Sequence, residues 1–389
     1  MAVFRDDLLE AQWLRAASHT SYGGAEIGEC FAAAKNIRED DPESWFGAWT
    51  GLADAVLAEG KKSSGAPARA CALRAANYYR AATLFLYRAP PDPRLRETWR
   101  KHRDAFAAAE LGEEMSIPYE GRSLHGWFFR GGADAAKRPT LIVNGGYDST
   151  AEEGWLFSGA AAVARGYNAL SFDGPGQGKA LIEDGIVFRP DWENVIRPVV
   201  DDLVARPDVD TSRIALLGIS FGGYLAPRAA SGEPRLAACI ADPGEYSLFE
   251  EMQSRMPGFV ARNLPDGNRL VLRLLDTMLT RRLKHPTGGW GLRRGLFVHG
   301  VADPLAYLRL TADYTLEGRA ANIRCPTLVC SAAEDEIGVT AKKLFDMLTC
   351  DKAFIAFLAK EGAGGHCEAG TRTLFNLRAL DWLDRVLKR

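Results

Sequence analysis

The first hundred residues carry the apolar periodicity of amphipathic helices. Between Leu8 and Ala17 apolar residues recur at steps of three and four, which places them on one face of a helix. Further helices are expected over residues 25–38, 42–59, 69–88 and 94–109. The segment Gly60–Pro67 is polar and contains glycine and proline, so it is predicted to be a loop. The chain therefore begins with an all-helical region, residues 1–115.

After residue 115 the pattern changes to alternating strands and helices. Two short strands, 116–120 and 123–130, are predicted to form a hairpin around Glu120-Gly-Arg122. The apolar strands expected after it span residues 140–143, 168–172, 213–217, 236–241, 327–330 and 353–357. Fully apolar strands between helices are typical of a mostly parallel sheet covered on both faces.

The alternation is interrupted by a second helical segment. Residues 246–322 again have helical periodicity, and the strands resume after them. The predicted fold class is therefore α/β, with a core formed by residues 116–245 and 323–389. The helical insertion, residues 246–322, and the N-terminal region, residues 1–115, lie outside this core.

The charge balance, the apolar runs and the cysteines of the chain indicate which partners and which compartment to expect. The 389 residues include 48 basic and 50 acidic side chains, a formal charge of −2. Such a balance gives no electrostatic reason to expect nucleic acid, and no apolar run reaches the roughly 20 residues of a membrane helix. Seven cysteines without a Cys-x-x-Cys pair favour reduced thiols in the cytoplasm and no metal site.

The sharpest motif is Gly218-Ile-Ser220-Phe-Gly222, which lies between a predicted strand and a predicted helix. A serine at such a tight turn takes a strained backbone, and the flanking glycines avoid clashes. The turn exposes the serine Oγ above the sheet. It also brings the Phe221 N–H to a helix N-terminus, where negative charge is favoured. Ser220 is therefore the candidate nucleophile, with Phe221 as an oxyanion donor.

A nucleophilic serine needs a base, and the base needs a group that orients it. His366 lies in the Gly-rich loop Glu361–Glu368, between the last strand and the last helix. Asp335 follows the strand 327–330 directly. We favour Asp335 over its neighbours Glu334 and Glu336 because a shorter side chain suits a tight turn. The chain order Ser220, Asp335, His366 is that of the α/β-hydrolase arrangement.

A second oxyanion donor is expected in the loop Asn144-Gly-Gly-Tyr-Asp148, after the strand 140–143. We assign it to the Gly146 N–H, with Tyr147 as the competing neighbour, because glycine lets the backbone approach a substrate closely. The Tyr147 and Asp148 side chains are candidates either for substrate contacts or for capping the following helix. The pattern does not separate these two roles.

A glycine-rich segment, Asp173–Lys179, has some likeness to a phosphate-binding loop. It has three residues instead of four between Gly174 and Gly178, and Ala180 replaces the required serine or threonine. It also lacks the spacing of a dinucleotide-binding motif. We therefore predict a tight turn above the sheet, and no cofactor.

Taken together, these motifs resemble the α/β-hydrolase superfamily. The helical N-terminal region with Gly-Gly-Tyr-Asp-Ser and Gly-x-Ser-x-Gly-Gly-Tyr is more narrowly similar to one group within it. That group contains 2,6-dihydroxypseudooxynicotine hydrolase, FrsA-like proteins and fungal polyketide-shortening hydrolases. The resemblance implies that the N-terminal helices, residues 1–115, and the insertion, residues 246–322, together cover the active site as a lid. It also implies an additional acidic residue in some members, for which Glu245 is the nearest match. Asn144 stands where the family usually has histidine.

The function expected from these residues is that of a serine hydrolase using Ser220, His366 and Asp335 through an acyl-enzyme. The apolar insertion favours a medium-sized hydrophobic or aromatic small molecule. The resemblance adds C–C bonds of aryl ketone or polyketide type to ester bonds as targets. Two alternatives stay open: an acyltransferase or cyclase with the same triad, and a non-catalytic helical interaction protein. The helical surface also leaves a homodimer open.

Overall fold

The computed structural model of the protein describes residues 2–388, in two compact units. The first unit comprises Met1–Gly112 with Met278–Ala302, and the second comprises Glu113–Thr277 with Asp303–Arg389. The predicted insertion, residues 246–322, is thus divided between the two units. No helix among residues 2–388 is both long and apolar enough to cross a bilayer.

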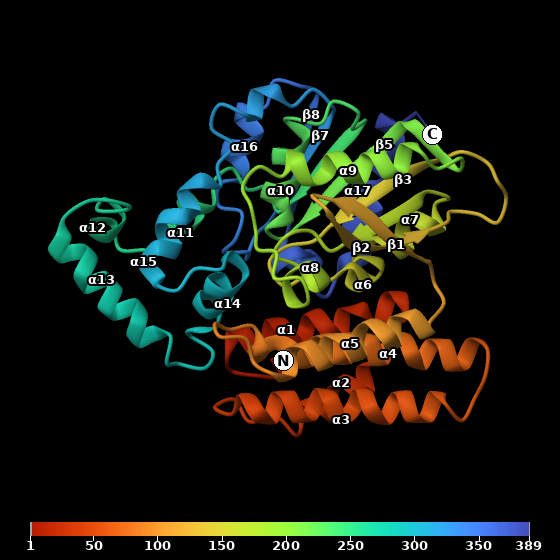
Figure 1. Cartoon of the computed structure of the whole chain (residues 1–389), viewed down its shortest axis with the longest axis horizontal. Helices are drawn as coiled ribbons and strands as arrows, with labels where there is room; N and C mark the ends of the chain where they lie inside the picture. Colours follow the sequence, from red (N-terminus) through yellow and green to blue (C-terminus); the bar gives the residue numbers. More distant parts are fainter. Residues whose placement is uncertain (1, 389) are drawn as a thin grey trace. The chain divides into compact units, whose positions relative to one another are not determined.

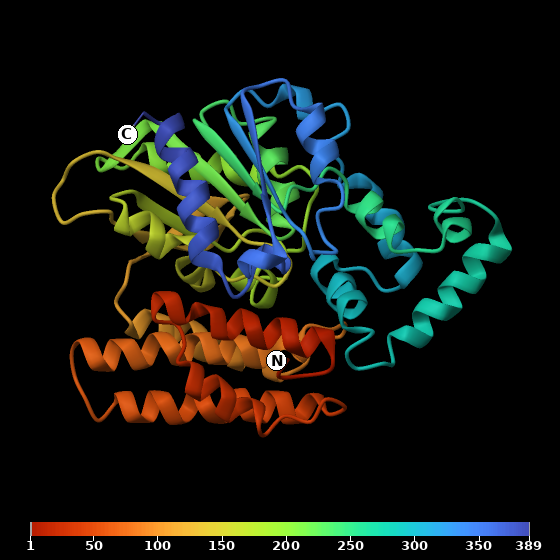
Figure 2. The same cartoon turned by 180° about the vertical axis from the view of Figure 1, so that it is seen from behind.

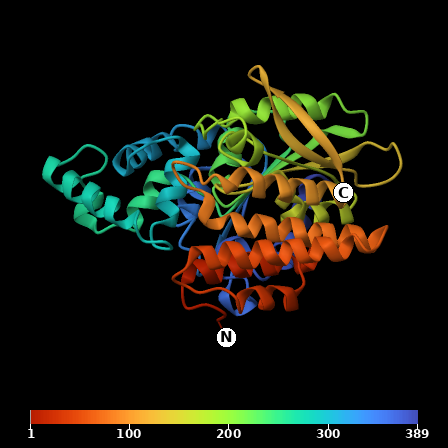
Figure 3. The same ribbon diagram turned by 60° about the horizontal axis from the view of Figure 1, so that its bottom comes forward.

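The first unit is all helical. Its N-terminal helices are α1 (Asp7–Ser18), α2 (Ile27–Ala34), α3 (Pro42–Gly60), α4 (Ala66–Ala82) and α5 (Arg94–Ala108). Helix α4 packs between α3 and α5, which lie beside it (Figure 3). The core between these helices contains the buried aromatic side chains Trp45, Trp49, Tyr78 and Trp99. Two helices are shorter than predicted: α2 ends at Ala34, and α4 passes into a 3₁₀ turn at Thr83.

Helix α14 (Trp290–His299) belongs to this unit although it lies far away in the sequence. Trp290 Nε1 donates to the Leu84 carbonyl oxygen over 2.7 Å. Phe297 packs against Tyr87 with the ring centroids 6.0 Å apart. These contacts explain why a segment of the predicted insertion groups with the N-terminal helices.

The second unit is built around an eight-stranded sheet in the order β1-β2-β4-β3-β5-β6-β7-β8 (Figure 1). The strands are β1 (Glu113–Tyr119), β2 (Arg122–Phe129), β3 (Arg138–Asn144), β4 (Asn168–Phe172), β5 (Val209–Ile219), β6 (Ala238–Asp242), β7 (Thr327–Ala332) and β8 (Lys352–Phe357). Only β1 with β2 and β2 with β4 pair antiparallel. The predicted α/β class, the hairpin and the mostly parallel sheet are confirmed.

Helices cover both faces of this sheet. Helices α9 (Glu193–Val204) and α10 (Gly222–Ala230) pack together on one face (Figure 1). Helices α7 (Ala160–Ala164) and α17 (Arg372–Val386) lie on the other (Figure 2). Helix α6 (Ala151–Gly154) continues through a π turn at Trp155–Gly159 into α7. The remaining helices of the unit are α8 (Gly178–Ile182), α11 (Leu248–Ser254), α12 (Gly258–Ala261), α15 (Pro304–Leu310) and α16 (Ala341–Met347). Helix α13 (Arg269–Arg282) crosses the boundary between the units.

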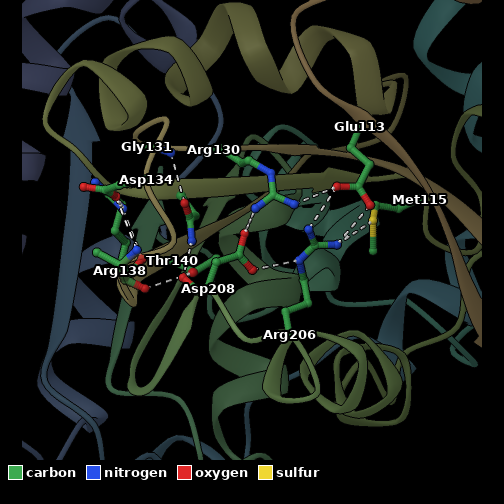
Figure 4. Close-up of polar contacts among 11 residues, drawn as sticks. Glu113, Met115, Arg130, Gly131, Asp134, Arg138, Thr140, Arg206 and Asp208 are labelled. Carbon is green, nitrogen blue, oxygen red and sulfur yellow. Dashed lines mark hydrogen bonds and ion pairs between the residues drawn. The ribbon is translucent and has the colours of Figure 1, made fainter.

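An ion-pair network lies at the amino ends of the parallel strands of the sheet (Figure 4). Arg206 donates to Glu113 over 3.0 Å and lies 3.4 Å from Asp208. Arg130 pairs with the same two carboxylates. The network ties β1 and β2 to the start of β5, and it leaves the opposite, carboxyl edge of the sheet for other groups.

Candidate active site

The loop from β5 into α10 holds Ser220 in a strained conformation. Its φ of +59° is in the left-handed region, which costs a residue with a side chain about 1–2 kcal/mol. A Cβ on Gly218 would lie 1.8 Å from the Gly222 carbonyl oxygen, and one on Gly222 would lie 2.5 Å from the Asn144 oxygen. Both motif glycines are therefore required by backbone packing, as the sequence predicted.

Ser220 is hydrogen-bonded to His366, and His366 to Asp335. His366 Nε2 lies 2.8 Å from Ser220 Oγ, and its Nδ1 lies 2.8 Å from Asp335 Oδ2. The Asp335 side chain is 3% exposed and that of His366 is 35% exposed. A buried carboxylate thus fixes the imidazole from inside, while the other side of the ring stays open to solvent. The structure brings together the three residues predicted to form a triad.

Asp335, and neither glutamate beside it, contacts the histidine. Glu334 and Glu336 are exposed. The Glu334 N–H donates to the Gly364 carbonyl oxygen over 2.9 Å and so joins the aspartate loop to the histidine loop. Asp335 Oδ1 accepts from the Ile337 N–H over 2.9 Å, which leaves Oδ2 for the imidazole.

Glu251 of α11 supports this aspartate loop and was not identified from the sequence. Its buried carboxylate accepts from the N–H groups of Gly338, Val339 and Thr340 over 2.8–3.2 Å. The Thr340 hydroxyl adds a fourth bond of 2.5 Å. No sequence motif links a glutamate in a helical insertion to a loop almost ninety residues later, so only the folded chain reveals the contact.

The loop Asn144–Asp148, in which the second oxyanion donor is expected, is called the oxyanion loop below. It differs from expectation at Gly146. Its N–H donates to Ser149 Oγ over 2.8 Å, so this predicted donor is already engaged. The residue must nevertheless be glycine, because a Cβ there would lie 2.8 Å from Ser220 Cβ and 2.9 Å from the Phe221 nitrogen. Gly146 thus lies directly beside the serine. Tyr147 is the neighbour that the sequence offers as the competing second donor.

The turn 173–178 braces this loop. Gln177 Nε2 donates to the carbonyl oxygens of Gly145 and Gly146 over 2.7 and 2.8 Å. Asn144, at the usual histidine position, accepts from Trp192 Nε1 over 2.7 Å. The segment with a likeness to a phosphate loop is therefore a turn above the sheet that fixes the oxyanion loop.

Among the described residues, His125, Glu152 and Asp173 form the group with donor atoms close enough to hold a metal ion, all within 4.8 Å of one another. His125 Nε2 lies 3.1 Å from Glu152 Oε1. The two Asp173 oxygens accept from the N–H groups of Ala151 and Lys179 over 2.7 and 2.8 Å. Burial, with the Glu152 charge, raises the pKa of Asp173 to about 7. Because backbone amides bond both Asp173 oxygens, we assign this group a structural role in holding the segments at Ala151 and Lys179, and not a metal-binding role.

The three predicted substrate contacts lie in different surroundings. Tyr147 is buried, with its ring centroid 4.5 Å from that of Phe221 and its hydroxyl 3.1 Å from the Tyr307 hydroxyl of α15. Asp148 is half-buried. Thr150 caps the following helix through a bond from the Glu153 N–H to its Oγ1, so neither Tyr147 nor Asp148 is the cap.

Glu245 is a buried acid behind the triad. Burial raises its pKa well above the usual value, and the charges of Glu251 and Asp335 raise it further. Burial therefore favours the neutral form of this carboxyl group, and a neutral carboxyl can donate a hydrogen bond.

Residues 140–373 match the alpha/beta hydrolase family. Hydrolase acrC of Aspergillus aculeatus is 32% identical over 98% of this chain and 97% of its own length. The 20-hydroxy-prefusarin hydrolase FUS2 of Gibberella moniliformis is 33% identical, over 98% of this chain and 97% of its own.

Two solved structures share the architecture over nearly the whole chain. That of 2,6-dihydroxy-pseudo-oxynicotine hydrolase has a TM-score of 0.75 at 22% identity and covers 95% of both chains. AbyA5 has a TM-score of 0.63 at 20% identity, covering 93% of this chain and 95% of its own. At these identities the likeness shows the fold.

Proposed function

This chain belongs to the alpha/beta hydrolase family and is a hydrolase, and we propose that Ser220 is its nucleophile. The observation that carries the proposal is the chain of two 2.8 Å hydrogen bonds from Ser220 through His366 to Asp335. A serine hydroxyl becomes nucleophilic when an oriented imidazole can accept its proton as it attacks. The left-handed backbone of Ser220 supports the assignment, because such strain is concentrated at functional sites.

In the proposed first step Ser220 Oγ attacks a substrate carbonyl and passes its proton to His366 Nε2. The buried Asp335 side chain stabilises the imidazolium that forms. The Phe221 N–H at the start of α10 donates to the oxyanion, and we propose the Tyr147 N–H as second donor, since the Gly146 N–H is bonded to Ser149. His366 then protonates the leaving group, and an acyl group remains on Ser220.

The second step releases the acyl group to water. His366 takes a proton from the water as the water oxygen attacks the acyl carbon. It then gives this proton to Ser220 Oγ as the acyl bond breaks, which yields a carboxylic acid and free Ser220. If the first bond broken is an ester, the leaving group is an alcohol. If it is a C–C bond, the leaving group is a carbanion, so an adjacent ketone or electron-rich aryl ring must delocalise its charge.

The substrate class we propose is a medium-sized aromatic or polyketide-type carbonyl compound. Tyr147, Phe221 and Tyr307 place aromatic surface beside the serine. Two of the similar proteins carry the names of hydrolases of 20-hydroxy-prefusarin and 2,6-dihydroxy-pseudo-oxynicotine. Burial favours the neutral form of Glu245, and in that form its carboxyl group would donate a hydrogen bond to an oxygen of such a substrate. The seven free cysteines favour a reducing compartment, and we place the protein in the cytoplasm.

The proposal is tested with 4-nitrophenyl acyl esters and aryl β-diketones in water enriched in ¹⁸O. We expect turnover by the wild type, with one ¹⁸O entering the acid product from the deacylating water. Ser220→Ala should be inactive, whereas Ser212→Ala, at the exposed far end of the same strand, should match the wild type. Turnover by Ser220→Ala would contradict the proposal. A product without ¹⁸O would favour acyl transfer or cyclisation.

A further inference from the structure

A buried cluster of three charged residues lies next to the triad and has no part in the chemistry above. Asp242 ends β6, Glu368 closes the turn that begins at His366, and Arg372 begins α17. Arg372 Nη1 donates to Asp242 Oδ2 over 2.6 Å and to Glu368 Oε2 over 3.1 Å. None of the three side chains is more than 3% exposed. Water therefore plays no part in balancing these charges.

Two carboxyl groups of the cluster face one guanidinium. Arg372 bonds Asp242 Oδ2 and Glu368 Oε2, whereas the buried Asp242 Oδ1 and Glu368 Oε1 have no hydrogen-bond donor among the described residues, so burial favours one proton on the pair. Burial raises the pKa of Glu368 well above its usual value, and the Asp242 charge adds to this. One neutral acid, one carboxylate and one guanidinium leave the cluster without net charge, as a fully buried site requires.

The cluster is bonded to the backbone on both sides of the Ser220–His366 contact. On the serine side, the Asp242 carbonyl oxygen accepts from the Ser220 N–H over 2.7 Å. On the histidine side, Arg372 Nη1 donates to the Cys367 carbonyl oxygen over 3.1 Å. One buried unit thus spans the two loops whose side chains must stay 2.8 Å apart.

The histidine loop needs such support because it is strained. Cys367 and Glu368 have φ values of +50° and +49°, two consecutive left-handed residues that are not glycine. A left-handed backbone is unfavourable for a residue with a side chain and persists only where the surroundings impose it. The residue just before this pair is His366, so relaxation of the pair would move the imidazole.

We propose that Glu368, by bonding to Arg372 beside Asp242, is a positioning residue that holds His366 against Ser220. The inference rests on the proposed function, since it concerns the placement of the proposed base. Glu368 does not touch the reacting atoms. Its effect is carried by the loop backbone, through the turn that links it to His366.

The test is the rate at which a small fluorophosphonate labels Ser220, measured by intact mass and normalised to the folded fraction. Glu368→Gln keeps a neutral side chain that accepts from Arg372 and can donate to Asp242, so its rate should stay within threefold of the wild type. Glu368→Leu removes the bond to Arg372 at similar volume, and its rate should fall at least 100-fold. The matched control is Glu361→Gln, which alters a partly exposed ion pair with Arg378 in the same loop and should match the wild type.

A second set of variants tests whether Arg372 needs one carboxylate partner. Asp242→Asn leaves Glu368 as the carboxylate partner of Arg372, so it should label within threefold of the wild type. The double variant Asp242→Asn with Glu368→Gln leaves a buried guanidinium without a counter-charge, and its rate should fall at least 100-fold. If the cluster only filled space, the double variant would not label far more slowly than both single variants. A near-wild-type rate in each single variant with a large loss in the double variant therefore indicates that one carboxylate must remain for Arg372.

Several outcomes would overturn the inference. It is wrong if folded Glu368→Leu labels at the wild-type rate with the wild-type pH profile, or if Glu368→Gln is as slow as Glu368→Leu. If Glu368→Leu does not fold, Glu368→Asp decides, because its shorter acid lies farther from Arg372: a rate at least tenfold lower supports the inference, and an unchanged rate overturns it. A folded wild type that takes up no label contradicts the proposed function itself, and this inference with it.

Discussion

The support of the aspartate loop by Glu251 leads to a quantitative prediction. This carboxylate, buried in α11, accepts four hydrogen bonds from the segment Gly338–Thr340. Glu251→Gln replaces one carboxylate oxygen by an NH₂ group, which would face N–H donors. At least one of the four bonds is lost whichever way the amide is turned, because the Thr340 hydroxyl can turn to accept whereas the N–H groups cannot.

The magnitude follows from these bonds. A hydrogen bond to a charged acceptor contributes about 1.5–3 kcal/mol, so the loss of one bond costs at least about 1.5 kcal/mol. The remaining bonds go to a neutral acceptor and are weaker, so we expect a total loss of about 2–4 kcal/mol in the free energy of unfolding. Asp335 lies three residues before Gly338, and a displacement of about 1 Å there would slow catalysis about 100-fold.

The control is the adjacent residue of the same helix. Glu250 forms an ion pair with Lys343 in which both side chains are more than a third exposed. Such a pair contributes about 0–1 kcal/mol, so Glu250→Gln should remain near the wild type. Both variants would be compared by urea unfolding and by the rate of fluorophosphonate labelling. The reasoning is refuted if Glu251→Gln loses no more stability than Glu250→Gln, or if it labels at the wild-type rate.

Three further predictions follow from other parts of the chain. Ser220→Gly should be more stable than Ser220→Ala by about 0.5–1 kcal/mol, because glycine relieves the left-handed strain at some cost in unfolded-state entropy; equal unfolding midpoints would contradict the strain. Asp173 has a pKa raised by burial to about 7, so the folded state holds its proton between pH 4 and 7 while the unfolded state has lost it. Stability should therefore fall as pH rises through this window, and by less in Asp173→Asn; identical pH slopes in urea unfolding would rule this out. Deleting residues 1–112 removes the helices that Trp290 and Phe297 of the 278–302 segment pack against, so the truncated chain should aggregate. If residues 278–302 are also replaced by a Gly-Ser linker, light scattering should again show a monodisperse protein.

Local signals in the sequence were sufficient for much of the fold. The hairpin, the apolar strands and the Gly-x-Ser-x-Gly turn each depend on neighbours in the chain, so their residues carry the pattern directly. The resemblance to the α/β-hydrolase superfamily is confirmed by the family match and by the relatives. The chain order of Ser220, Asp335 and His366 sufficed to select residues that the structure brings within hydrogen-bond distance.

What the sequence missed depends on contacts between distant segments. Glu251 contacts Thr340, and Arg372 contacts Asp242, across long stretches of chain that no periodicity connects. The Gly146 N–H was selected for its glycine, but the hydroxyl of Ser149 competes for it. The insertion 246–322 was read as one segment because its periodicity is uniformly helical. Its division between two units depends on the partners of Trp290 and Phe297.

The central claim is that Ser220 is an activated nucleophile, and intact-protein mass after exposure to a small fluorophosphonate tests it most directly. We predict a single adduct on the wild type, located to Ser220 by peptide mapping and absent from folded Ser220→Ala. His366→Ala should label at least 1,000-fold more slowly, since the serine then has no base. An adduct that persists in Ser220→Ala, or a folded wild type that never gains one, would contradict the account.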